Sequence, residues 1–319
     1  MQTMGNGWLW GIFAAIVLVM LAVDLLIFKG GERHRVSLKE AAGWSIAWVS
    51  VAVLFGIGLW VYLALTVGRD IANDTALKFF AGYVVEKSLA VDNVFVWMMI
   101  FSYFCVPLEL QRRVLLYGIL GAVFLRTIMI LMGSWIISDF HWILYVFGVF
   151  LVFTGIKMVR SAEQSEDLEQ NPLLKWMRNR FPITPQMVGE RFFVVQDGMR
   201  MVTPLFLALV LVEISDMIFA VDSIPTVFAI TTDPFIVLTS NLFAILGLRA
   251  MYFLLADVGD RFSLLKYGLA MILVFIGVKM LVVDWIKVPV WLSLSVIASI
   301  LTISVVASLI RARKREWLS

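Results

Sequence analysis

The stretch EKSLAVDN, residues 86–93, places two carboxylates and an amide inside a run that otherwise has the composition of a membrane-spanning helix. A second stretch of this kind, EISDMIFAVDS, occupies residues 213–223. An ionisable side chain at the centre of a bilayer costs about 2.5–3.5 kcal/mol on insertion scales, so such side chains are usually functional. Five acids therefore form the candidate site: Glu86, Asp92, Glu213, Asp216 and Asp222.

The composition places the whole chain in a membrane. Its 319 residues are 61% hydrophobic and 15% charged, whereas globular domains average about 25% charged residues. The single cysteine, Cys105, excludes an intrachain disulfide and a CxxC redox pair. The formal charge of +3 comes from loop lysines and arginines, so no nucleic-acid surface is expected.

Apolar runs of about 20 residues, the length that crosses a bilayer, predict an all-α bundle of transmembrane helices. Most lysines and arginines outside these runs fall in connections on one side of the membrane, and by the positive-inside rule this side is cytoplasmic. The N-terminus is then outside and the C-terminus cytoplasmic. The nine predicted helices span residues 8–28, 42–66, 78–104, 113–132, 141–159, 203–229, 236–255, 265–284 and 289–310.

Two segments of three helices repeat each other in sequence. AVDN at 90–93 matches AVDS at 220–223, and FTGIKM at 153–158 matches FIGVKM at 275–280, with a Leu-Arg pair between them in each half. A copy that follows three helices enters the membrane from the opposite face, so the repeats are expected to be inverted, with a substrate site near the midplane. The predicted units are residues 1–66 (two helices), 78–159 (first repeat), 160–202 (cytoplasmic linker), 203–284 (second repeat) and 285–319 (ninth helix and basic tail).

Two local features refine this organisation. Within the linker, two short apolar runs flank an Asp-Gly pair at 197–198, which predicts a β-hairpin. Pro225 lies three residues after Asp222 and is expected to kink or open the helix, so that Asp222 could turn inward.

The side chains near the acids supply only oxygen ligands and three bases. Oxygen ligands without His or Cys favour hard divalent ions, namely Mg, Ca or Mn. A proton-coupled site also fits, because clustered carboxylates share protons. Additional candidate ligands are Asn93, Ser88, Ser215 and Ser223, and the candidate charge-balancing bases are Lys87, Arg126 and Arg249.

A purely structural role competes with this interpretation. Arg126 and Arg249 could pair with acids simply to hold helices together, and Lys157 and Lys279 could extend to the interface. Five acids nevertheless exceed three deep bases, and a cation or protons must balance the remainder. Residues 22–24 read AVD and so repeat the first three residues of the motif, and whether Asp24 joins the site stays open.

The two acidic stretches, together with TTDPFIVLTSNLFAILGL at 231–248, resemble the TerC family of integral membrane proteins, and its Alx-like branch in particular. The resemblance covers the chain from end to end. It implies a bacterial inner-membrane exporter of manganese with a LysE-like architecture, and it carries the metal-site role to the five acids named above. The family is also described as a redox modulator linked to tellurium resistance, which the residues themselves do not support.

Two other classes of function compete with a transporter of divalent metal ions. An intramembrane aspartyl protease usually carries a GxGD motif, but residues 257–260 read DVGD and lack the first glycine. A metal-sensing or scaffold protein would recruit partners through the 160–202 linker and the basic tail. Selectivity for Mn over Mg or Ca, coupling to protons and the oligomeric state are left open by the sequence.

Overall fold

The computed structural model describes residues 3–27, 38–140, 142–161, 172–196, 198–256, 264–286 and 288–316, and it is all-helical apart from one hairpin. In chain order the elements are α1 (Gly7–Ile27), α2 (Leu38–Thr66), α3 (Arg69–Tyr103), α4 (Leu108–Asp139), α5 (Ile143–Ser161), α6 (Pro172–Arg180), β1 (Phe193–Gln196), β2 (Met199–Val202), α7 (Pro204–Phe228), α8 (Pro234–Leu246), α9 (Leu248–Ala256), α10 (Leu265–Leu281) and α11 (Val290–Glu316).

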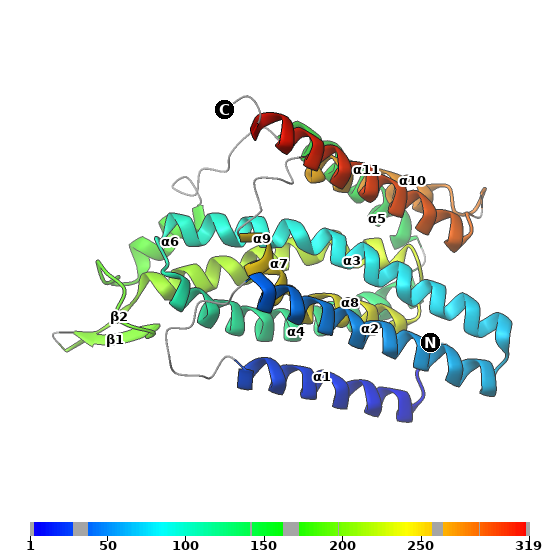
Figure 1. Ribbon diagram of the computed structural model, residues 1–319, viewed down its shortest axis with the longest axis horizontal. Helices are drawn as coiled ribbons and strands as arrows, with labels where there is room; N and C mark the ends of the chain where they lie inside the picture. The colour runs from blue at the N-terminus through cyan, green and yellow to red at the C-terminus, as the bar shows by residue number, and fades with distance from the viewer. Residues whose placement is uncertain are drawn as a thin grey trace.

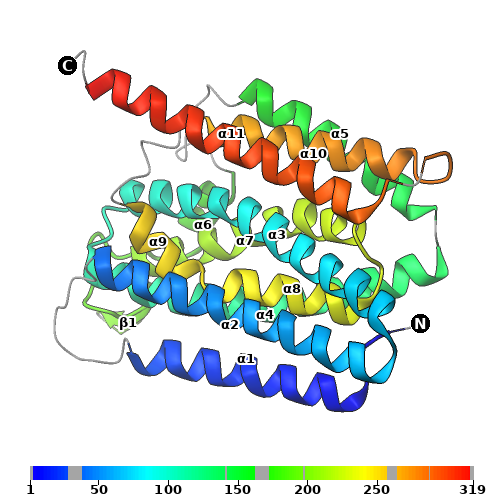
Figure 2. The same cartoon turned by 45° about the vertical axis from the view of Figure 1, so that its right-hand side comes forward.

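The long helices run back and forth along one axis of the molecule (Figure 1). α1 begins at the end where the N-terminus is marked, and α11 ends at the opposite end, as the turned view in Figure 2 also shows. Seven segments in the described part of the chain are long and apolar enough to cross a membrane. The chain is therefore a multi-pass integral membrane protein.

The prediction of nine helices needs correction. With α8 and α9 taken as one broken helix, the described residues form ten helices, because α6 folds within the predicted linker. α3 and α10 are not among the seven segments that meet the requirements for a span. α3 carries Glu86, Lys87 and Asp92 in one stretch, and α10 has only 17 residues.

The part of the linker that the structure describes is folded against one end of the bundle. Leu174 and Met177 of α6 pack on Leu207 of α7. β1 and β2 pair antiparallel, with Phe193 opposite Val202 and Gln196 opposite Met199, so the runs on either side of the Asp-Gly pair form the predicted hairpin. Gly198 has φ +76°, a conformation that glycine adopts without strain. Asp197 lies outside the described residues.

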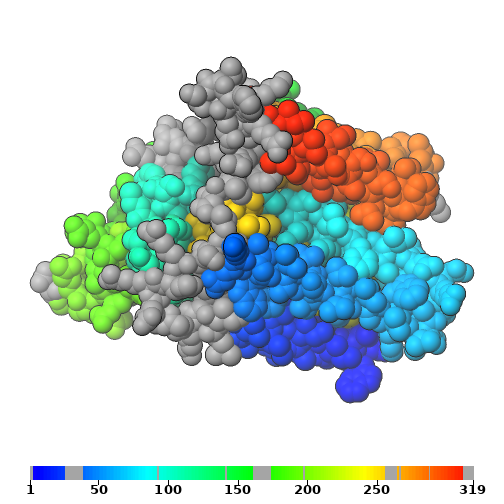
Figure 3. All heavy atoms as spheres, in the orientation of Figure 1, coloured from blue at the N-terminus to red at the C-terminus, as the bar shows by residue number. Residues whose placement is uncertain are grey.

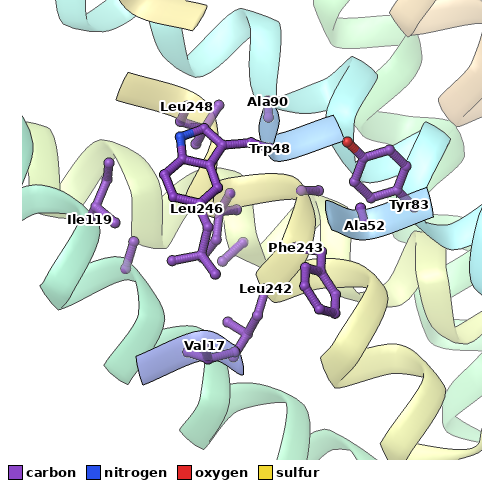
Figure 4. Packing of buried hydrophobic residues seen from close by; sticks show 14 of the residues in the cluster. Val17, Trp48, Ala52, Tyr83, Ala90, Ile119, Leu242, Phe243, Leu246 and Leu248 are labelled. Carbon is purple, nitrogen blue, oxygen red and sulfur yellow. The ribbon is translucent and has the colours of Figure 1, made fainter. Parts of the chain in front are cut away.

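The centre of the bundle is the α8 helix. Every residue of α8 is buried, which is typical of a helix surrounded by others on all sides. Phe243 lies among aromatic rings from three other segments, and its ring centroid is 4.8 Å from that of Phe55. Figure 4 shows the surrounding core, in which Val17, Trp48, Tyr83 and Ile119 bring α1, α2, α3 and α4 to the same interior.

The contacts between the two halves are reciprocal. α3 packs against α8 and α4 packs against α7, while α5 packs against α10. The α5–α10 contact is close because glycines face backbone: a Cβ on Gly155 would lie 2.8 Å from the carbonyl oxygen of Ala270, and one on Gly277 would lie 2.7 Å from that of Gly148. α10 and α11 form a layer on one flank of the bundle, and α1 and α2 cover another (Figure 3).

Candidate functional site

Arg126 of α4 joins the two acidic stretches. Its Nη1 donates to Oε1 of Glu86 on α3, and its Nη2 and Nε donate to Asp216 on α7 at 3.0 and 3.3 Å. The Arg126 and Asp216 side chains are 1% and 2% exposed, and Glu86 is equally enclosed. Two carboxylates and one guanidinium therefore form a buried cluster, which we call the Arg126 cluster and which also includes Asn93, Ser223 and Asn241.

The remaining members of the Arg126 cluster are polar and uncharged. Nδ2 of Asn93 donates to Asp216 at 3.1 Å, and the Ser223 hydroxyl donates to Glu86 at 3.3 Å. Asn241 of α8 accepts from Nη1 of Arg126 at 3.1 Å. Glu86 and Asn93 are seven residues apart on α3, as are Asp216 and Ser223 on α7, so each pair lies on one helix face.

Several polar atoms of the cluster lack a partner among the described residues. They include Oε2 of Glu86, Oδ1 of Asn93 and Nδ2 of Asn241. A buried polar atom without a hydrogen bond costs about 1–3 kcal/mol. The cluster is therefore incompletely satisfied and has oxygens free to accept a ligand.

Glu213 lies near the Arg126 cluster but does not hydrogen-bond with its members. It is three residues before Asp216 on α7, and its carboxylate lies against Gly121 of α4, where a Cβ would be 2.2 Å from the carboxylate oxygens. Its Oε2 is buried without a partner in the described part of the chain. Gly121 thus provides the space for a third carboxylate.

Asp222 and Asp92 are not placed in the cluster. Asp222 accepts from the Thr154 hydroxyl of α5 at 3.3 Å, so it faces a different helix from Asp216. The side chain of Asp92 lies outside the described residues, although its backbone belongs to α3. Asp222 is six residues after Asp216 on α7, a spacing that places it on a different face of an α-helix.

The other two predicted bases have separate partners. Arg249 of α9 pairs with Asp24 of α1 at 2.9 Å and also donates to the main-chain oxygen of Asp24 at 2.6 Å. Lys87 donates to the carbonyl oxygen of Ala244 near the C-terminus of α8, at 3.1 Å. Asp24 therefore belongs to an ion pair with Arg249, and Lys87 satisfies a helix-end carbonyl.

Three further predictions concern two serine ligands, a helix break at Pro225 and the DVGD sequence. The hydroxyls of Ser88 and Ser215 donate to carbonyl oxygens of their own helices, at 2.6 and 2.7 Å. The helix does not open at Pro225, because α7 stays helical to Phe228, and the alternative of a kink there stays a prediction; a helix break lies instead at Gly247, between α8 and α9. Residues 257–260, which contain the DVGD sequence, lie outside the described residues.

Asn241 was missed by sequence reasoning, which counted charges. The available signal was an amide in the run 234–246, whose other residues are apolar or carry a hydroxyl, since burying an amide without a partner is also costly. Within the described side chains, no three Asp, Glu, His or Cys residues come together as a metal site. In this structure the position between the carboxylates of Glu86 and Asp216 holds the guanidinium of Arg126.

Long apolar helices that bury ionised side chains from both sequence repeats define a multi-pass membrane protein with a polar intramembrane site. The model of the integral membrane protein TerC family matches residues 71–316. The chain belongs to this family.

Relatives match the chain over nearly its full length. The "Putative membrane-bound redox modulator Alx" of Salmonella typhi is 58% identical over 306 residues, which cover 96% of this chain and 95% of the relative. An "Uncharacterized membrane protein STKORF319" of Myxococcus xanthus is 49% identical, covering 98% and 95%, and an uncharacterized membrane protein of Rickettsia bellii is 39% identical, covering 95% and 97%. No solved structure matches.

Proposed function

We propose that this protein exports a divalent cation, Mn(II), across a bacterial inner membrane, with the Arg126 cluster and Glu213 as the intramembrane site. The observation that carries the proposal is the excess of negative charge in the cluster: Glu86 and Asp216 are shared by one guanidinium in a fully buried environment. A buried charge needs a partner, and a transported cation supplies it.

The donor set fits a hard divalent ion. Every side chain that could bind a cation in the cluster does so through oxygen, and the partner-free Oε2 of Glu86 and Oδ1 of Asn93 are of this type. Mn, Mg and Ca share this ligand preference, so Mg and Ca serve as competitors in binding experiments. Asp222 on α7 adds a carboxylate outside the cluster, and protons return through the carboxylates when the cation has left.

The transport mechanism uses the two repeats as inverted halves. α3, α4 and α5 correspond to α7, the broken α8–α9 segment and α10, and members of each pair run in opposite directions (Figures 1 and 2). The reciprocal packing of α3 on α8 and of α4 on α7 supports a two-fold axis in the membrane plane. The N-terminus then faces the outside, and α6 and the hairpin face the cytoplasm.

Cellular manganese tests this proposal. Cells of a manganese-sensitive strain that make the wild type should hold less Mn than cells making Glu86→Gln or Asp216→Asn at equal abundance. Asp74→Asn is the matched control, because Asp74 is exposed and pairs only with Lys78 among the described residues. Equal Mn contents in all four strains would overturn the proposal.

A metal-sensing scaffold is the second candidate, and the folded linker favours it. Glu190 pairs with Arg113 at 2.8 Å, and the Arg113 guanidinium lies 5.3 Å from the centroid of the Phe192 ring, so the linker is docked on α4. Val195 and Met199 of the hairpin are exposed. Val195→Ser with Met199→Ser should abolish the function of a scaffold and leave manganese export by a transporter unchanged.

A further inference from the structure

We propose that Arg126 is a tethered substitute for the transported cation: its guanidinium occupies the position between Glu86 and Asp216 when no ion is bound, and it has to leave for a divalent cation to bind. The inference rests on the proposed function and adds the exchange step to it.

The contacts of Arg126 support occupation of the site itself. One guanidinium donates hydrogen bonds to Oε1 of Glu86 and to both carboxylate oxygens of Asp216. It also donates to Ser223 and Asn241. A divalent ion needs oxygen ligands at about 2.0–2.6 Å. It cannot reach both carboxylates while a guanidinium lies between them and repels it.

The charges support an exchange of one cation for another. With Arg126 in place, two carboxylates face one positive charge, and a divalent ion in its place would neutralise both. The oxygens left without a partner, Oε2 of Glu86 and Oδ1 of Asn93, are buried at the same place and are available to complete the coordination. A monovalent ion would only reproduce the charge that Arg126 already supplies, so the exchange favours a divalent ion.

Arg249 provides the comparison within the chain. It occupies the matching Leu-Arg position of the second repeat, but it pairs with Asp24 and with the main chain of that residue. Arg249 and Asp24 balance each other, and this pair connects α1 to α9. We assign it a structural role.

Binding of Mn(II) to the purified, detergent-solubilised protein tests the inference, with free Mn(II) measured by its electron paramagnetic resonance signal. If Arg126 occupies the site in most molecules, only the remaining fraction can bind the ion, and the apparent affinity is the intrinsic affinity multiplied by that fraction. Arg126→Gln should therefore bind Mn(II) at least about tenfold more tightly than the wild type does. Arg249→Gln, the matched control, should bind with wild-type affinity.

A second variant covers the case in which Arg126→Gln does not fold. Arg126→Lys keeps the charge but cannot bridge both carboxylates with a planar fork, so it should also bind Mn(II) more tightly than the wild type. Wild-type or weaker affinity in a folded Arg126 variant would overturn the inference while leaving transport intact. Absence of Mn(II) binding in the wild type and in every variant would overturn the proposed function together with it.

Discussion

Two carboxylates and one guanidinium are held away from water in the Arg126 cluster, and the energetic consequence is an interdependence among the three. Breaking a buried ion pair by removing one partner costs about 3–5 kcal/mol, because the other charge stays buried without compensation. The cluster therefore couples the stability of the protein to the occupancy of the site. Ion binding should stabilise the protein most where Arg126 is missing.

The stability of Arg126 variants follows from this. Without added metal, Arg126→Gln should lower the free energy of unfolding by about 3 kcal/mol, since Glu86 and Asp216 lose their shared partner. The double variant Glu86→Gln/Arg126→Gln removes one of the two carboxylates and should lose less than the sum of the single variants. Thermal unfolding in detergent measures both, and additive losses would show that the three side chains are not coupled.

A substitution at Gly121 tests Glu213 without altering a charge. A Cβ there would lie 2.2 Å from the Glu213 carboxylate, so Gly121→Ala should displace that carboxylate and slow manganese transport while the fold is retained. Gly118→Ala is the control one turn earlier on α4, where the nearest atom is a Val212 methyl at 3.0 Å. Equal transport by both variants would exclude Glu213 from the path.

Part of this site was predictable from the sequence. The seven-residue spacing placed Glu86 with Asn93 and Asp216 with Ser223, because helical periodicity alone fixes which residues share a face. Which base lies between the two acids depends on how α3, α4 and α7 pack, so Arg126 and Arg249 looked equivalent although only Arg126 joins the acids. The pairing of Asp24 with Arg249 and the part played by Asn241 depend on packing in the same way.

At the scale of elements, close contact between helices rests on small residues. α5 and α10 approach through Gly148, Gly155 and Gly277, as expected where helices associate in a membrane. Helix positions were predictable because apolar runs mark them, but several ends were not: α3 begins at Arg69, nine residues before the predicted start, because polar residues such as Asp74 and Lys78 pair along its first turns.

The α5–α10 contact gives a matched pair of glycine variants. Gly155→Ala should destabilise the protein by about 1–3 kcal/mol, because the new methyl group would meet the backbone of α10. Gly58→Ala on α2 meets nothing within 4 Å and should be neutral or stabilising, by up to about 1 kcal/mol. Thermal unfolding midpoints compare the two, and a loss of similar size in both would contradict the packing shown here.

At the scale of the molecule, the two ends of the bundle differ. The end with α6 and the hairpin carries the basic linker, and Tyr103 at the end of α3 accepts from Arg178 there at 3.1 Å. Charge asymmetry predicted this difference from sequence, whereas the ion pair that fastens α1 to α9 could not be foreseen. The proposed orientation places the α6 end in the cytoplasm.

The single cysteine is a natural probe of that orientation. Cys105 is exposed in the connection between α3 and α4, so a membrane-impermeant maleimide should label it only after cells are permeabilised. Val67→Cys in a Cys105→Ser background places the thiol between α2 and α3, at the opposite end, and should be labelled in intact cells. The reverse pattern would invert the proposed topology.

The most direct test of the central claim is manganese flux through proteoliposomes that contain the purified protein, with and without a pH gradient. The wild type and Asp74→Asn should move Mn(II) across the membrane. Glu86→Gln and Asp216→Asn should lose at least about nine-tenths of that flux, a tenfold change that corresponds to roughly 1.4 kcal/mol. Flux in Glu86→Gln and Asp216→Asn equal to the wild type would show that the Arg126 cluster is not the transport site.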